Sequence, residues 1–169
     1  MLKKYHEQVE ARAAERIPPL PLTAAEVTEL VALLESGSSD GEELLELLTH
    51  RVPAGVDDAA QVKARFLAAV ASGEKRVSLI TPLRAIELLG TMLGGFNVAP
   101  LIDALEGDEM LATAAVDSLS KTLLVFDAFD TVVAKMEAGN AYAKRVVESW
   151  AEAEWFTSRD ALAEQITVT

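Results

Sequence analysis

The 169 residues are 50% hydrophobic and 5% aromatic, enough for one domain whose core is mainly leucine, valine and alanine. The 27 acidic and 15 basic residues give a net charge of −12, which disfavours nucleic-acid binding because that binding depends on Lys and Arg at the phosphates. The absence of cysteine excludes disulfides, thiolate zinc sites, iron–sulfur ligation and a cysteine nucleophile.

The first predicted element is an amphipathic helix over about residues 2–16, which ends before the proline-rich stretch 18–21. This segment is too polar for a secretory signal peptide. No uninterrupted apolar run in the sequence approaches the length that crosses a bilayer. We therefore expect a cytoplasmic protein without membrane contact.

The next helix starts carry recognisable capping signals. Thr23 with Glu26 has the form of a capping box, in which the hydroxyl accepts from the Glu26 amide and the carboxylate reaches back. Two later pairs have the same form and predict the same contacts: Asp40 with Glu43, and Asp58 with Gln61. Gly73 is placed to close its helix in left-handed backbone, and Thr81-Pro82 predicts a cap followed by proline at the first helical position.

The second half continues the helical pattern. A short helix is expected over about residues 98–106. From Asp108, two helices or one long bent helix carry an apolar stripe, followed after Gly139-Asn140 by a helix with a second stripe. The stripes are Leu119, Leu123, Phe126, Phe129, Val133 and Met136, then Tyr142, Val146, Trp150 and Ala153. A last short helix is expected after Ser158, and residues 166–169 have strand composition.

Helical spacing with short connections predicts an all-α fold of about nine or ten short helices, arranged as a HEAT-like stack of antiparallel pairs. An irregular bundle is the alternative, since no exact sequence repeat is present. The same pattern gives no catalytic or metal site. His6 and His50 each lack a second histidine at helical spacing, and the carboxylates mostly fall on solvated faces and caps.

Two segments have the composition of contact surfaces. Gly94, Gly95, Phe96 and Asn97 form either a simple helix–turn–helix joint or a segment that faces a neighbouring domain, where Asn97 can donate and accept hydrogen bonds. These glycines are no phosphate loop, because no Gly-Lys-Ser or Gly-Lys-Thr follows them. Near the C-terminus, the candidate interface residues are Trp150, Trp155 and Phe156, and one tryptophan is expected to face the core and the other a different surface.

Three blocks carry a resemblance to a known family: Arg51-Val52-Pro53-Ala54-Gly55-Val56-Asp57, the run 81–105, and Ser149-Trp150-Ala151-Glu152-Ala153-Glu154-Trp155-Phe156. Together they resemble the N-terminal HEAT-like domain of bacterial aconitase B, also called aconitate hydratase 2 or 2-methylisocitrate dehydratase. The resemblance implies a right-handed HEAT-like domain over residues 1–160. Residues 161–169 are then a tail that leads towards a swivelling domain absent from this chain.

The resemblance also implies a function. The parent enzymes are lyases of the tricarboxylic acid cycle that interconvert citrate and isocitrate through cis-aconitate with a [4Fe-4S] cluster, and many act on 2-methylisocitrate. Their HEAT-like domain supplies no cluster cysteine and is expected to contact the swivelling and catalytic domains, to dimerise and to shape the route to the active site. The chain alone is expected to be inactive, with no cofactor of its own. A stand-alone helical adaptor that binds another protein is the alternative function.

The chain departs from the family pattern in the glycine-rich segment. A Tyr-Asn pair is expected after the double glycine and often a His before the following proline, whereas this chain has Phe96-Asn97 and Ala99-Pro100. If these side chains line a passage, its polarity is lower here, and Asn97 is a better candidate than Phe96 for a polar contact.

Overall fold

The computed structural model describes residues 1–122 and 128–152, and helices are the only regular elements in this part of the chain. The helices are α1 (Leu2–Ala14), α2 (Ala24–Ser36), α3 (Gly41–His50), α4 (Asp58–Ala71), α5 (Pro82–Gly90), α6 (Val98–Ala104), α7 (Glu109–Leu119), α8 (Phe129–Glu137) and α9 (Ala141–Glu152). The predicted all-α fold is therefore confirmed, and none of these helices is long and apolar enough to cross a membrane. The expected last helix and the tail lie outside the described residues.

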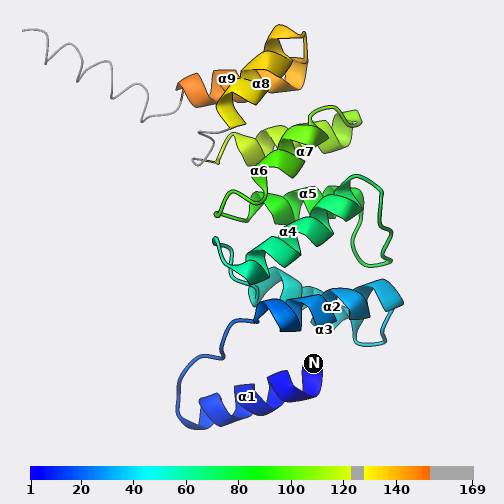
Figure 1. Ribbon diagram of the computed structural model, residues 1–169, viewed down its shortest axis with the longest axis vertical. Helices are drawn as coiled ribbons and strands as arrows, with labels where there is room; N and C mark the ends of the chain where they lie inside the picture. The colour runs from blue at the N-terminus through cyan, green and yellow to red at the C-terminus, as the bar shows by residue number, and fades with distance from the viewer. Residues whose placement is uncertain (123–127, 153–169) are drawn as a thin grey trace, which may run out of the picture.

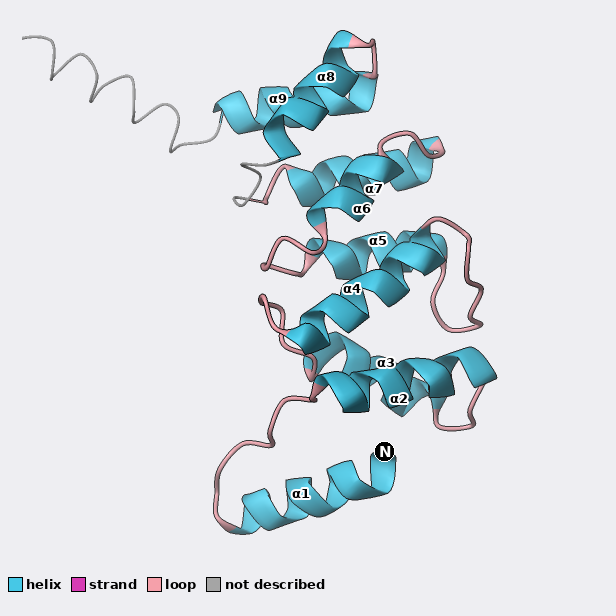
Figure 2. Cartoon of the chain, viewed as in Figure 1, coloured by secondary structure: helices cyan, strands magenta, loops and turns pink. Residues whose placement is uncertain are grey.

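The helices are stacked in a row along the longest axis of the molecule (Figure 1). Helix α2 packs on α3 and α4, α5 packs on α4 and α7, and α9 packs on α7 and α8. Helix α1 lies at one end of the row and makes fewer contacts with the other helices. The connections alternate between the two edges of the row (Figure 2). That this row is a right-handed HEAT-like stack stays a prediction.

Two of the predicted helix starts are confirmed in atomic detail. The Thr23 hydroxyl accepts a hydrogen bond from the Glu26 amide at 3.3 Å, and the Glu26 carboxylate accepts one from the Thr23 amide at 2.9 Å. The latter bond is the main reason that the pKa of Glu26 lies below its ordinary value, because it favours the charged carboxylate. Thr81 likewise accepts from the Arg84 amide at 3.1 Å, with Pro82 as the first helical residue.

The other two predicted caps were wrong in different ways. Asp40 precedes α3 but makes no side-chain capping bond, because its backbone (ψ 22°) lacks the extended conformation that aims a cap side chain at the helix. Its expected partner Glu43 instead contacts His6 of α1 at 2.5 Å. The cap of α4 is Asp57 rather than Asp58, and its carboxylate accepts from the Ala60 amide at 3.1 Å.

The helix ends match the predictions only in part. Gly73 has φ 78° and follows Ser72, the C-cap of α4, which confirms its predicted left-handed conformation. Helix α1 ends two residues earlier than expected, and Arg16 takes a positive φ of 59° in the turn that follows. Helix α6 is also shorter than expected, ending at Ala104.

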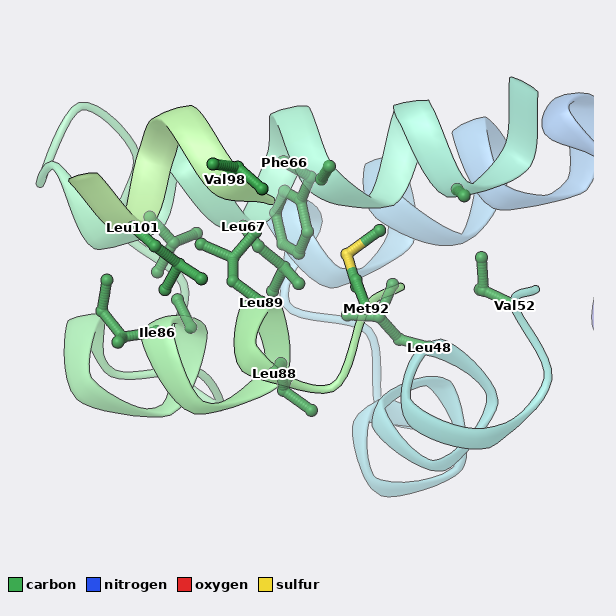
Figure 3. Packing of buried hydrophobic residues seen from close by; sticks show 14 of the residues in the cluster. Leu48, Val52, Phe66, Leu67, Ile86, Leu88, Leu89, Met92, Val98 and Leu101 are labelled. Carbon is green, nitrogen blue, oxygen red and sulfur yellow. The ribbon is translucent and has the colours of Figure 1, made fainter. Parts of the chain in front are cut away.

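One continuous apolar core runs along the row, from Tyr5 in α1 to Trp150 in α9. Figure 3 shows its middle, where side chains of α3, α4, α5 and α6 converge. The predicted stripe on α8 is confirmed only in part: Met136 packs against the core and Val133 is half-buried, but Val132 is the fully buried residue and Phe129 is 40% exposed. In α9, Val146 and Trp150 are buried as predicted and Tyr142 is half-buried. Leu123, Phe126 and Ala153 lie outside the described residues.

Candidate interaction surfaces

The glycine-rich segment forms a closely packed joint between two connections. The Leu93 amide donates to the Ala54 carbonyl at 2.7 Å, so the α5–α6 connection (residues 91–97) is tied to the α3–α4 connection (residues 51–57). Gly94 lies so close to this partner that a Cβ atom there would be 2.0 Å from the Gly55 oxygen. Only glycine fits this contact, which explains one member of the Gly94-Gly95 pair.

Asn97 belongs to the inside of this joint. Its side chain is fully buried, and its amide nitrogen donates to the carbonyls of Leu89 at 2.9 Å and Met92 at 3.0 Å, which closes the C-terminal end of α5. This placement does not support the expected contact between the Asn97 amide and a neighbouring domain, because those donors are used within the chain. Phe96 is half-buried against the core. A passage-lining role for residues 94–97 stays a prediction.

Two side chains point outward from the joint, Val56 and Leu93, and neither was predicted from the sequence as a contact residue. Val56 is 76% exposed and Leu93 is 72% exposed, although both are large apolar residues. Gly94 packs on the backbone at Gly55 and Val56, which brings the two connections together. The sequence gives only a weak indication that Val56 and Leu93 are exposed: each is apolar, lies beside glycine and belongs to no helical stripe.

At the other end of the row, Trp150 is the tryptophan that faces the core. It is 4% exposed, its indole nitrogen donates to the Leu119 carbonyl at 2.8 Å, and its ring stacks on Phe129 with centroids 5.9 Å apart. A buried, hydrogen-bonded tryptophan of this kind holds α9 against α7 and α8 and is unsuited to a surface contact. Trp155 and Phe156 lie outside the described residues, so their interface role stays a prediction.

Both histidines lie near carboxylates in the part of the chain that the structure describes. His6 pairs with Glu43 at 2.5 Å, and His50 lies 3.7 Å from Glu46 on the same helix. Across residues 1–122 and 128–152, no three acidic, histidine or cysteine side chains come together as metal ligands would.

Among the charged residues that the structure describes, Lys63 is the exception, because it is 2% exposed. Burial away from water lowers its pKa from 10.5 to about 8. Its ammonium group reaches the Thr49 carbonyl at 3.4 Å, near the C-terminal end of α3.

Hollows on the surface are shallow and have mixed linings. One of about 470 Å³ lies between α4, α6 and α7 and is lined mainly by small side chains, with Arg65, Glu74 and Asp103 among them. Another of about 400 Å³ lies between α7 and α9, with Lys121 and Arg145 beside acidic residues. Both hollows are lined by charged side chains of both signs.

The comparison with known proteins supports the resemblance seen in the sequence. The model of the aconitate B N-terminal domain matches residues 4–156. Aconitate hydratase B is 58% identical in Escherichia coli K12, 56% in Salmonella typhimurium and 48% in Pseudomonas aeruginosa, each over the whole of this chain. The chain spans about one fifth of the length of these relatives, 20%, 20% and 19% respectively. The chain belongs to the aconitate B N-terminal domain family.

Proposed function

We propose that the chain is the non-catalytic N-terminal domain of an aconitate hydratase B-type enzyme, which interconverts citrate and isocitrate through cis-aconitate and dehydrates 2-methylisocitrate. The observation that carries the proposal is the family match over residues 4–156, supported by relatives that are all named aconitate hydratase B. The proposed role is to contact the swivelling and catalytic domains, to form a homodimer and to shape the route to the active site.

The residues of this chain do not fit the [4Fe-4S] cluster of such an enzyme. Iron–sulfur clusters are held by cysteine thiolates, and none of the 169 residues is cysteine. The two histidines are paired with carboxylates in separate helices, α1 and α3, rather than brought to a common point. The cluster and the chemistry at its iron therefore belong to other parts of the proposed enzyme.

A row of helices with one continuous core suits a structural role. Its backbone elements are fixed by buried leucines and by capped helix ends, so a surface on it keeps its shape when a partner binds. Such preorganisation lowers the entropy that association costs. The closely packed joint between residues 51–57 and 91–97 is the clearest example of a surface of this kind.

The proposal is tested by dividing the enzyme at this domain. The 169-residue chain, treated anaerobically with ferrous iron and sulfide, should show neither iron–sulfur absorbance nor turnover of citrate. After the same treatment, the enzyme without residues 1–160 should show iron–sulfur absorbance. Its kcat/KM for citrate should fall, because this domain no longer shapes the route to the active site. Turnover by the chain alone would contradict the non-catalytic role. An unchanged kcat/KM in the truncated enzyme would contradict the role in shaping the route.

A further inference from the structure

Exposed apolar side chains are unevenly distributed over the described residues. Seven large ones are well exposed: Ile17, Leu20, Val56, Leu79, Leu93, Met110 and Phe129. Four of the seven lie in the connections α1–α2, α3–α4 and α5–α6, and these connections share one edge of the row, on the left in Figure 2. We call this edge, residues 15–23, 51–57 and 91–97, the loop edge.

Hydrogen bonds tie the three connections of the loop edge together. The Arg51 guanidinium donates to the carbonyls of Pro19 at 2.6 Å and Leu20 at 3.2 Å, and the Leu22 amide donates to the Arg51 carbonyl at 2.9 Å. The bond from Leu93 to Ala54 then joins the third connection. The exposed apolar side chains therefore lie on backbone that is held by hydrogen bonds between the connections. A partner would not have to order this backbone on binding.

The centre of this edge is also poor in charge, in a chain whose net charge is −12. Residues 51–57 and 91–97 contain two ionisable side chains, Arg51 and Asp57. Arg51 is engaged with the α1–α2 connection, and Asp57 caps α4. The opposite edge differs, since its connection 72–81 alone holds Glu74, Lys75 and Arg76. Charge depletion around exposed apolar groups is typical of the centre of an interface.

We propose that the loop edge, centred on Val56 and Leu93, docks against the part of the enzyme's own polypeptide that lies beyond this domain. The inference rests on the proposed function. The relatives are about five times as long as this chain, which makes a covalently linked partner available at all times. Val56 and Leu93 are each more than 70% exposed, so a contact that covers them removes apolar surface from water, and an intramolecular contact does so continuously. The charged opposite edge then remains in solvent.

Photo-crosslinking in the full-length enzyme tests which edge docks. We would replace Leu93 with p-benzoylphenylalanine in one variant and Met110, which is 58% exposed at the start of α7, in the control. Position 93 should crosslink to residues of the same polypeptide beyond 169, without a shift to twice the mass, and position 110 should not. Crosslinks from position 93 to a second copy, crosslinks from position 110 alone, or none from either position would overturn the proposal.

A charge placed on the edge gives a second readout. Val56→Asp should lower the crosslink yield from position 93 by about tenfold, because docking would bury an unpaired carboxylate. Asp58→Ala lies nearby outside the apolar centre and should leave the yield unchanged. An unchanged yield with Val56→Asp would also overturn the assignment of this edge. The failure of the proposed function is recognised separately, by turnover of citrate in the chain alone.

Discussion

At the scale of single residues, Lys63 gives the clearest consequence for stability. Burial disfavours its ammonium form, so the pKa of about 8 in the folded chain lies below the value near 10.5 in the unfolded chain. Between these two pH values the unfolded chain binds more protons than the folded one. The free energy of unfolding should therefore rise with pH in this window, and below pH 8 the full penalty is present.

We expect Lys63→Met to stabilise the chain by about 1–3 kcal/mol at pH 7, because it removes a buried charge that contacts the Thr49 carbonyl but no carboxylate among the described residues, and it keeps the side-chain volume. Urea unfolding at pH 7 and at pH 10 measures this, and the gain should shrink at the higher pH. Lys144→Met, at an exposed lysine that pairs with Glu148 on the same helix, is the control and should change stability little. A destabilisation by Lys63→Met at both pH values would contradict this account.

At the scale of elements, the helix starts separate what the sequence determines locally from what it does not. Thr23 and Thr81 were assigned correctly because each capping bond closes within four residues. Asp57 and Asp58 are neighbours of the same type, and only the backbone conformation decides which of them caps α4. Glu43 was assigned wrongly because a contact with His6, 37 residues away, takes its carboxylate.

A helix start with a capping bond and one without can be compared in a matched pair of variants. Thr23→Ala should lower the free energy of unfolding by about 1 kcal/mol, since it leaves the Glu26 amide without its hydroxyl acceptor. Asp40→Ala should lower it by less than about 0.5 kcal/mol, because no capping bond is lost. Thermal or urea unfolding of both variants compares the two losses. Equal losses would show that the Thr23 box contributes no more than an uncapped start.

At the scale of the whole molecule, the candidate surfaces show why function was harder to predict than fold. The all-α fold follows from periodicity and punctuation within short segments. The loop edge instead requires residues 37 positions apart, Val56 and Leu93, to be brought to the same edge by the order of the helices. Neither residue has a distinctive local pattern. The segment that did look distinctive, residues 94–97, contributes a close packing contact and a buried amide.

An uncovered loop edge should change how the 169-residue chain behaves in solution. Exposed apolar groups on a braced surface favour association between copies, so we expect the mass of the chain measured by static light scattering to rise with concentration. Leu93→Asp should return the chain to a monomer, because self-association would then bury a carboxylate without a partner. Met110→Asp adds the same charge away from the edge and should leave the association unchanged. A strict monomer at high concentration would contradict this expectation and show that Val56 and Leu93 form too small a surface to hold two copies together. Their contact with the rest of the enzyme would then depend on the covalent link.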